Sequence, residues 1–152
     1  MRGGGLADGL VAGAVGSTAL NIVTYLDMVL RARPASQTPQ QSAAKVADAV
    51  HLDLGLDGQA DNRRSGLGAL MGYGAGLATA VGFALLTRGR RQPLPRAAAL
   101  LGGAAMTVAD GSLTLLRVTD PRTWRRTDWI ADLVPHLAYG ITAAATWNRL
   151  RP

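Results

Sequence analysis

The sequence contains no cysteine, no glutamate, a single lysine and a single phenylalanine among its 152 residues. Without cysteine the chain can form no disulfide, and it has no thiolate for a zinc site, an iron–sulfur cluster or nucleophilic catalysis. One phenylalanine is few for a soluble domain of this length, because water-soluble cores are normally filled by large aromatic and branched side chains. Charged residues make up 17% of the chain, below the roughly 25% usual in soluble domains. These absences argue against a soluble globular protein.

Motifs that carry chemistry are also missing. The chain has no HExxH, no GxSxG and no phosphate-binding loop with its lysine, since Lys45 is the only lysine. The glycine-rich segments lie within apolar runs that read as helices, and not between a strand and a helix. The sequence therefore predicts no cofactor and no resident metal, and it favours a protein that is not an enzyme.

Four stretches are long and apolar enough to cross a lipid bilayer, which takes about 20 residues in a helix. The first is uncharged until Asp27 and is followed by Pro34, a helix stop. It is too long for a secretory signal, so we expect it to be retained. We predict an all-α fold, a four-helix transmembrane bundle in a single integral membrane domain over residues 1–152. The predicted spans are residues 9–30, 67–86, 97–116 and 129–147.

A soluble bundle of alanine-rich helices is the alternative. It requires a charged face that recurs at helical spacing on each helix, and residues 67–86 contain no charged residue at all. In water such a helix would expose apolar side chains on every side. We therefore expect the lipid bilayer to surround the four helices.

The first loop is long and carries both signs of charge. Within it, Thr38 followed by Pro39 is typical of a helix start, with Thr38 as the N-cap. Small and apolar residues then recur at roughly helical spacing, which predicts a short amphipathic helix over residues 39–50, lying on the membrane surface or on the bundle. Asp57 and Gly58 indicate a turn.

The net charge of +6 comes from arginines that lie between the apolar runs. This distribution is typical of membrane topology signals, so we expect no nucleic-acid partner. Four spans put both termini and the second loop on one side, with seven basic residues from Arg2 to Arg151, against nine on the other side. The raw count does not decide the orientation. The second loop, residues 87–96, concentrates four arginines without an acid, and from this we predict cytoplasmic termini in the inner (plasma) membrane.

Small residues recur every fourth position in the predicted spans, as in a glycine zipper. Such a line lets helix backbones approach closely, and it serves either packing within the chain or a homo-oligomer seam. The clearest line is in the second span. The predicted packing residues are Gly9 and Gly13, continued by Ser17, in the first span; Gly68, Gly72 and Gly76, continued by Ala80 and Ala84, in the second; Ala99, Gly103, Thr107 and Gly111 in the third; and Gly140 and Ala144 in the fourth.

Several polar side chains fall inside the predicted spans, toward the side of the first and third loops. Ionisable groups in hydrocarbon are expensive, so they call for an explanation. One explanation is a polar pocket in which a carboxylate beside the histidine supports proton transfer, or in which three carboxylates and the histidine hold a divalent cation. The other is structural, namely pairing of Asp27 with Arg31 and helix capping by Asp128 or Asp132. The candidate cluster is Asp27, Asp110, Asp132, His136, Asn21 and Tyr25, with Pro135 breaking the helix beside the histidine.

The last third of the chain resembles a known type of membrane protein. The residues that carry the likeness are Val118-Thr119-Asp120-Pro121, Trp124, Trp129, Asp132, Pro135-His136-Leu137 and Tyr139. They resemble small four-span actinobacterial membrane proteins and, more distantly, the YagU-type inner membrane proteins. The resemblance implies a location and a topology, and it implies no activity.

Three functions remain open at this point. The first is an accessory or scaffold subunit that docks against other membrane subunits or against itself. The second is an oligomeric proton- or cation-linked transporter or channel that uses Asp110, Asp132 and His136. The third is a membrane enzyme acting on lipid headgroups, with Asp132 and His136 beside Trp124.

Overall fold

The computed structural model describes residues 4–151, apart from the side chains of Gly4 and Asp57, and Arg2 lies outside this range. Over that range the chain is all-helical, with no strand, so the predicted fold class is confirmed at this level. The elements are α1 (Gly4–Arg31), α2 (Thr38–Ala49), α3 (Asp57–Leu86), α4 (Leu94–Leu115), the short 3-10 turn η1 (Pro121–Thr123) and α5 (Arg126–Leu150).

Three of these helices are long and apolar enough to cross a membrane, over Gly5–Arg31, Gly58–Leu86 and Leu94–Leu115. In the most apolar 18-residue stretch of each of these helices, at most 28% of the residues are buried, so most residues of these apolar stretches reach the surface. Helix α5 is not among them. Asp132, Pro135 and His136 lie close together in this helix and lower its mean hydropathy. By length and composition the described residues thus contain three candidate spans, one fewer than the sequence analysis predicted.

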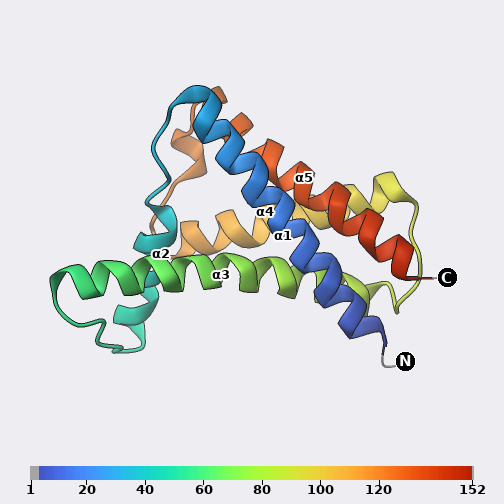
Figure 1. Cartoon of the computed structure of the whole chain (residues 1–152), viewed down its shortest axis with the longest axis horizontal. Coiled ribbons are helices and arrows are strands. Elements are labelled where there is room, and N and C mark those ends of the chain that lie inside the picture. The colour runs from blue at the N-terminus through green and yellow to red at the C-terminus, as the bar shows by residue number, and fades with distance from the viewer. Residues whose placement is uncertain (1–3, 152) are drawn as a thin grey trace.

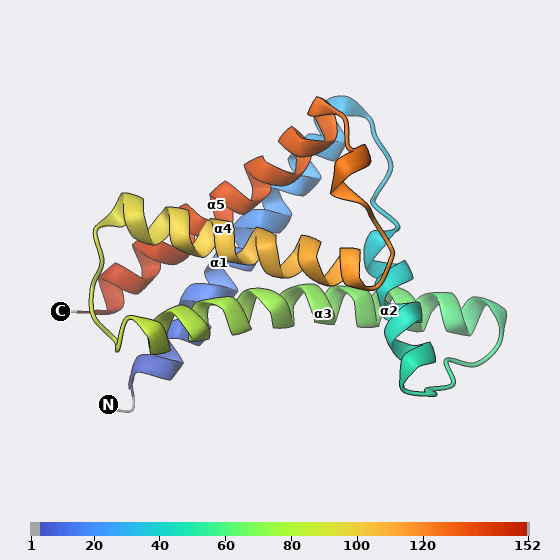
Figure 2. The same cartoon turned by 180° about the vertical axis from the view of Figure 1, so that it is seen from behind.

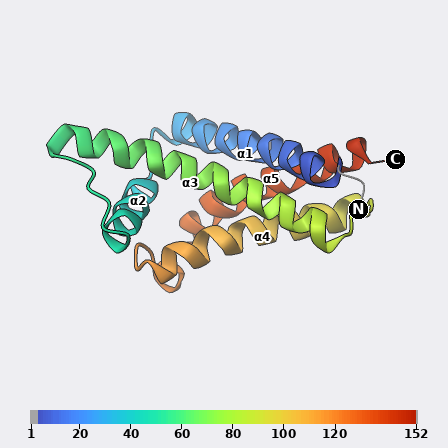
Figure 3. The same ribbon diagram turned by 90° about the horizontal axis from the view of Figure 1, so that it is seen from below.

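The helices form two pairs that draw apart at one end. Helices α1 and α5 run side by side, and they cross α3 and α4 so that the pairs diverge toward the end that carries α2 and η1 (Figures 1 and 2). Seen from below, α3 lies between α1 on one side and α4 on the other (Figure 3). The start of α1 and the end of α5 lie at the opposite end (Figure 1).

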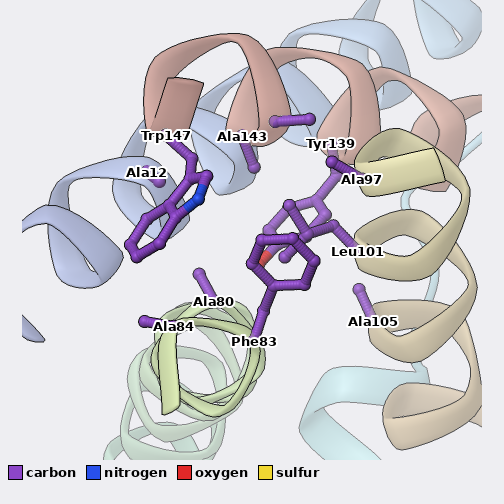
Figure 4. Packing of buried hydrophobic residues seen from close by; sticks show 11 residues of the cluster. Ala12, Ala80, Phe83, Ala84, Ala97, Leu101, Ala105, Tyr139, Ala143 and Trp147 are labelled. Carbon is purple, nitrogen blue, oxygen red and sulfur yellow. The ribbon is translucent and has the colours of Figure 1, made fainter. Parts of the chain in front are cut away.

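Helix α5 supplies the centre of the hydrophobic core. Tyr139, Ala143 and Trp147 are almost fully buried along one of its faces. Around them lie side chains from α1, α3 and α4 (Figure 4). Phe83 of α3 meets the Trp147 ring edge to face, with the ring centroids 5.9 Å apart. Helix α5, which has the most polar residues of the four long helices, therefore turns one face into the core and packs on α1 and α4.

Glycines let α1 approach α3 closely. A Cβ atom added at Gly13 would lie 2.9 Å from the Leu77 Cα, and one added at Gly9 would lie 3.2 Å from the Ala80 carbonyl oxygen. Backbone atoms fill these positions, so larger residues would force the helices apart. This line of small residues thus serves packing within the chain.

The glycines predicted to pack along one face of α3 do not share one partner. Gly76 faces Ser17 of α1, and Gly68 faces the Pro39 backbone at the start of α2. A Cβ atom at Gly72 would meet nothing within 4 Å, and Gly72 is exposed. The first-loop helix therefore lies against the bundle, on α3, and Gly72 does not contribute to packing within the described chain.

Helices α4 and α5 cross at a second pair of glycines. A Cβ atom at Gly102 would lie 2.8 Å from the His136 carbonyl oxygen, and one at Gly140 would meet the carbonyl oxygen of Ala98. The small residues predicted to pack on α4 do not share this face. Ala99, Gly103 and Thr107 are exposed, and Cβ atoms at Gly103 and Gly111 would meet nothing within 4 Å.

Two local predictions are wrong. Helix α3 begins at Asp57, ten residues before the predicted span, so the expected turn at Asp57 and Gly58 lies in its first turn. The apolar pattern ends near residue 67, but the helix continues through charged residues because hydrogen bonding within a helix does not require apolar side chains. The N-cap residue of α2 is Gln37 and not Thr38. The Thr38 backbone N–H donates to the Ser36 hydroxyl at 3.2 Å.

The end of α5 is tied to both pairs of helices. The Trp147 indole N–H donates to the Arg90 carbonyl at 3.2 Å, and the Asn148 amide donates to the Gln92 carbonyl at 2.9 Å. Arg151 pairs with Asp8 of α1 at 2.8 Å and lies over the Trp147 ring. These contacts join the chain ends to the second loop.

Candidate functional site

Three ionisable side chains from α4 and α5 meet where the two helix pairs begin to separate. Asp132 and His136 lie one turn apart on α5, as their spacing predicted, with the His136 Nδ1 3.5 Å from the Asp132 carboxyl. Asp110 of α4 lies near Asp132, close enough for the two carboxyl groups to interact electrostatically. These three residues form the acid–histidine cluster.

The hydrogen bonds of the cluster assign a tautomer to the histidine. The His136 Nδ1 lies 2.8 Å from the Asp132 backbone carbonyl, which can only accept. In the neutral ring, Nδ1 therefore carries the proton and Nε2 is left as an acceptor. Only 10% of the His136 side chain is exposed, so this acceptor lies largely inside the bundle.

The Asp110 and Asp132 carboxyl groups cannot both be charged without an electrostatic cost. One oxygen of Asp132, Oδ2, is buried and has no hydrogen-bond donor among the described residues. When both carboxyl groups are ionised they repel each other, and a proton held between them removes the repulsion. Within residues 4–151, no three His, Asp or Glu side chains are arranged to hold a metal ion. The cation-binding arrangement considered from the sequence is thus not found there.

Asp27 lies apart from the cluster. Its carboxylate pairs with Arg31 at 2.7 Å and with Arg33 at 2.5 Å, beside the end of α1. This is the structural alternative that the four-residue spacing to Arg31 had suggested. Tyr25 is 60% exposed and also lies outside the cluster. Asn21 is half-buried on α1, five residues beyond Gly16, which contacts Tyr139 of α5.

The buried face of α5 continues the polar line beyond the cluster. The Tyr139 hydroxyl is buried and donates to the Gly76 carbonyl of α3 at 2.6 Å. The hydroxyl of Ser17, beside Gly76, is buried without a hydrogen-bond partner among the described residues. The sequence analysis did not place these two residues in the cluster. The spacing of Asp132, His136 and Tyr139, four and then three residues, was the available signal, because it describes one helix face.

A compact turn closes the open end between α4 and α5. The Trp124 indole N–H donates to the Thr119 hydroxyl at 2.9 Å, and the Trp124 and Trp129 rings lie 5.0 Å apart. Asp128 accepts the Arg125 backbone N–H at 3.0 Å, which is the helix capping anticipated for Asp128 or Asp132. This N–H, followed by the Arg125 guanidinium, holds the pKa of the Asp128 carboxyl below its usual range. Asp132 is left free of a capping role.

Comparisons with known proteins do not identify the chain: no protein-family model, no curated protein and no solved structure matches it.

Proposed function

We propose that the chain is a four-span integral membrane protein of the inner (plasma) membrane, with α1, α3, α4 and α5 crossing the bilayer. The observation that carries this proposal is the exposed apolar surface of the three candidate spans. Helix α5 fits as the fourth span because its outer face is apolar as well. The exposed side chains on that face are Ile130, Leu133, Val134, Leu137 and Ile141. Asp132 and His136, the ionisable residues within its apolar stretch, are turned inward, as expected for such groups in lipid.

Both termini and the second loop are proposed to be cytoplasmic. Arg88, Arg90 and Arg91 are exposed in that loop, and basic loops favour the cytoplasmic side. Because the chain has no cysteine, single introduced thiols report topology without a background. We expect Ala35→Cys in the first loop to react with a membrane-impermeant thiol reagent in intact cells. Arg90→Cys is the matched probe, and we expect it to react only after permeabilisation.

Equal labelling of both positions in intact cells would contradict the proposed topology. Purified protein that stays dispersed and helical in buffer without any amphiphile would contradict the membrane placement itself. The resemblance to the small actinobacterial and YagU-type proteins stays a prediction of the sequence.

We propose further that the acid–histidine cluster binds and releases a proton, and that the chain is the subunit of an oligomeric proton-linked transporter or channel. Asp110 and Asp132 share a space that suits one proton, and the Nε2 of His136 is an available acceptor beside them. The line from Asp132 through His136 to Tyr139 runs inside the bundle and not toward lipid. Four helices offer little room for a path, so an oligomer completes the transport unit in this proposal.

Reconstitution in liposomes tests the proton-linked function. We expect Asp110→Asn and His136→Ala to reduce proton flux at least about tenfold, since removing a positioned proton-transfer group commonly costs about 10²–10⁴-fold in rate. Asp120→Asn, which changes the carboxyl at the N-cap of η1, is the matched control and should leave the flux unchanged. Flux that is the same in all three variants and in the unaltered chain would remove the proposal.

An accessory or scaffold role is the second candidate, and the outer face of α4 favours it. Ala99, Gly103 and Thr107 are exposed there, and Gly103 and Gly111 leave open space for another helix to approach. Close backbone approach at small residues is a common way for membrane helices to associate. The test is native purification in mild detergent: a partner or second copy retained by the chain and lost on Gly103→Leu supports the role. A lone monomer in every preparation would exclude it.

A further inference from the structure

A groove of about 590 Å³ lies on the outer surface where α3 and α4 meet. Most of its wall is apolar or small, from Ala78, Gly82 and Leu86 on α3 to Leu100, Ala104 and Val108 on α4. The Thr79 hydroxyl within it donates to its own helix, to the Ala75 carbonyl at 2.8 Å. The groove is therefore suited to hydrocarbon along most of its length.

One end of the groove is different. Thr87, Gln92 and Arg96 line it beside the second loop. Arg96 is exposed, and the same short segment holds Arg88, Arg90 and Arg91 without an acid. Among residues 4–151, none of these four arginines forms an ion pair. The groove thus has an apolar body and one basic end, lined by Arg96 beside the arginine-rich second loop.

The length of the groove matches one leaflet of a membrane. From Arg96 to Val108 the α4 helix rises about 18 Å at 1.5 Å per residue, and half of a hydrocarbon core of about 30 Å is about 15 Å. A spanning helix of a partner protein would need a seam about twice as long. A single lipid chain that enters from the headgroup level needs a seam of this length.

We propose that this groove binds one anionic phospholipid, with an acyl chain along the wall of α3 and α4 and its phosphate group beside Arg96. The exposed arginines of the second loop add attraction for the negative headgroup, as basic pockets between membrane helices do. Gly82 hollows the wall, since a Cβ atom there would meet nothing within 4 Å. The inference goes beyond the proposed function and rests on the membrane placement proposed above.

The test is lipid retention by the full chain in mild detergent, measured by native mass spectrometry with phosphatidylglycerol and phosphatidylethanolamine as probes. We expect phosphatidylglycerol to remain bound at one per chain, about tenfold more tightly than phosphatidylethanolamine, because nearby basic residues attract an anionic headgroup. Gly82→Leu fills the groove and should abolish retention. Gly74→Leu is the matched control, because a Cβ atom at Gly74 also meets open space on α3 and Gly74 does not line the groove.

Arg96→Gln tests the headgroup contact separately from the acyl-chain contact. It should remove most of the preference for phosphatidylglycerol while the groove still accepts either lipid. Equal retention by Gly82→Leu and Gly74→Leu, or equal binding of the two lipids by the unaltered chain, would overturn the proposal. So would a second protein chain found in place of the lipid and displaced by Gly82→Leu. These outcomes are distinct from failure of the membrane placement, which would appear as a chain that needs no detergent.

Discussion

Gly140 and Gly102 lie at the crossing of α4 and α5, and backbone atoms already occupy the space that side chains would need. A Cβ atom at Gly140 would lie 2.8 Å from the Gly102 nitrogen and would also meet the Ala98 carbonyl oxygen. Backbone cannot yield as a flexible side chain does. We predict that Gly140→Ala lowers the free energy of unfolding by about 1–3 kcal/mol, as overpacking typically does, measured by thermal unfolding in detergent.

Gly103 is the control for this prediction, one residue away from Gly102 and on the outer face. An added methyl group there meets nothing within 4 Å, and alanine is the better helix former by about 1 kcal/mol. Gly103→Ala should therefore leave the stability unchanged or raise it. If both variants unfold at the same temperature, the crossing does not lie where the structure has it.

Asp128 provides a pH-dependent contact at the start of α5. Its folded pKa lies below the ordinary value of 3.8 because it accepts the Arg125 backbone N–H. A carboxyl with a depressed folded pKa contributes stability that is fully present above its unfolded pKa and is lost as the pH falls through the folded pKa. We predict that acidification from about pH 5 to about pH 3 destabilises the unaltered chain more than the Asp128→Asn variant. Parallel losses in both would show that Asp128 contributes nothing.

At the level of elements, the sequence predicts existence and type well and boundaries less well. The long apolar runs are enough to place α1, α4 and most of α3, because helices in lipid must satisfy their backbone internally. The first ten residues of α3, including Arg63 and Arg64, escape a hydropathy argument because they are polar and still helical. Proline after Thr38 indicates α2 within a residue or two, which is the usual precision of a helix end.

Helix spacing predicts the site only within one helix, and Asp110 entered the predicted cluster through its depth in the third span. The four-residue spacing of Asp132 and His136 places them on one face of α5. The third member, Asp110, depends on which face α4 turns to α5, and the sequence pattern pointed to the line of Gly103. The structure uses Gly102 instead, and this difference of one residue rotates the face by about 100° in a helix of 3.6 residues per turn. Tertiary packing, which has no period in the sequence, therefore determines the cluster.

Helix α2 is held on α3 by a close approach that can be tested on its own. A Cβ atom at Gly68 would lie 2.6 Å from the Pro39 carbonyl oxygen, whereas one at Gly66 meets open space. We predict that Gly68→Val detaches α2 and that Gly66→Val, which has the same helix propensity cost, does not. Ala43, 1% exposed on α2, is the reporter: thiol labelling of Ala43→Cys should rise about tenfold in the first variant, since overpacking costs about 1–3 kcal/mol. Equal labelling in the two backgrounds would mean that α2 is not docked there.

At the scale of the whole molecule, α5 joins the closely packed pair α1 and α3 to α4, which packs less extensively on α3. It packs against α1 and α4, and its last residues contact the second loop through Arg90 and Gln92. We predict that a chain ending at residue 125 still enters the membrane, because the three apolar candidate spans remain, but is degraded rapidly. Residues 126–152 expressed as a separate segment should restore its lifetime, measured by pulse–chase. A truncated chain as long-lived as the full one would contradict the central role of α5.

The position of α5 has a consequence for biosynthesis. In the proposed topology, translation delivers α1, α3 and α4 to the membrane before α5 exists, yet Tyr139, Ala143 and Trp147 of α5 occupy the middle of the finished core. The nascent protein must therefore keep an unfilled interior until α5 leaves the ribosome. In the proposed four-span topology, α5 then enters a partly assembled protein and not bare lipid, which lowers the cost of inserting Asp132 and His136.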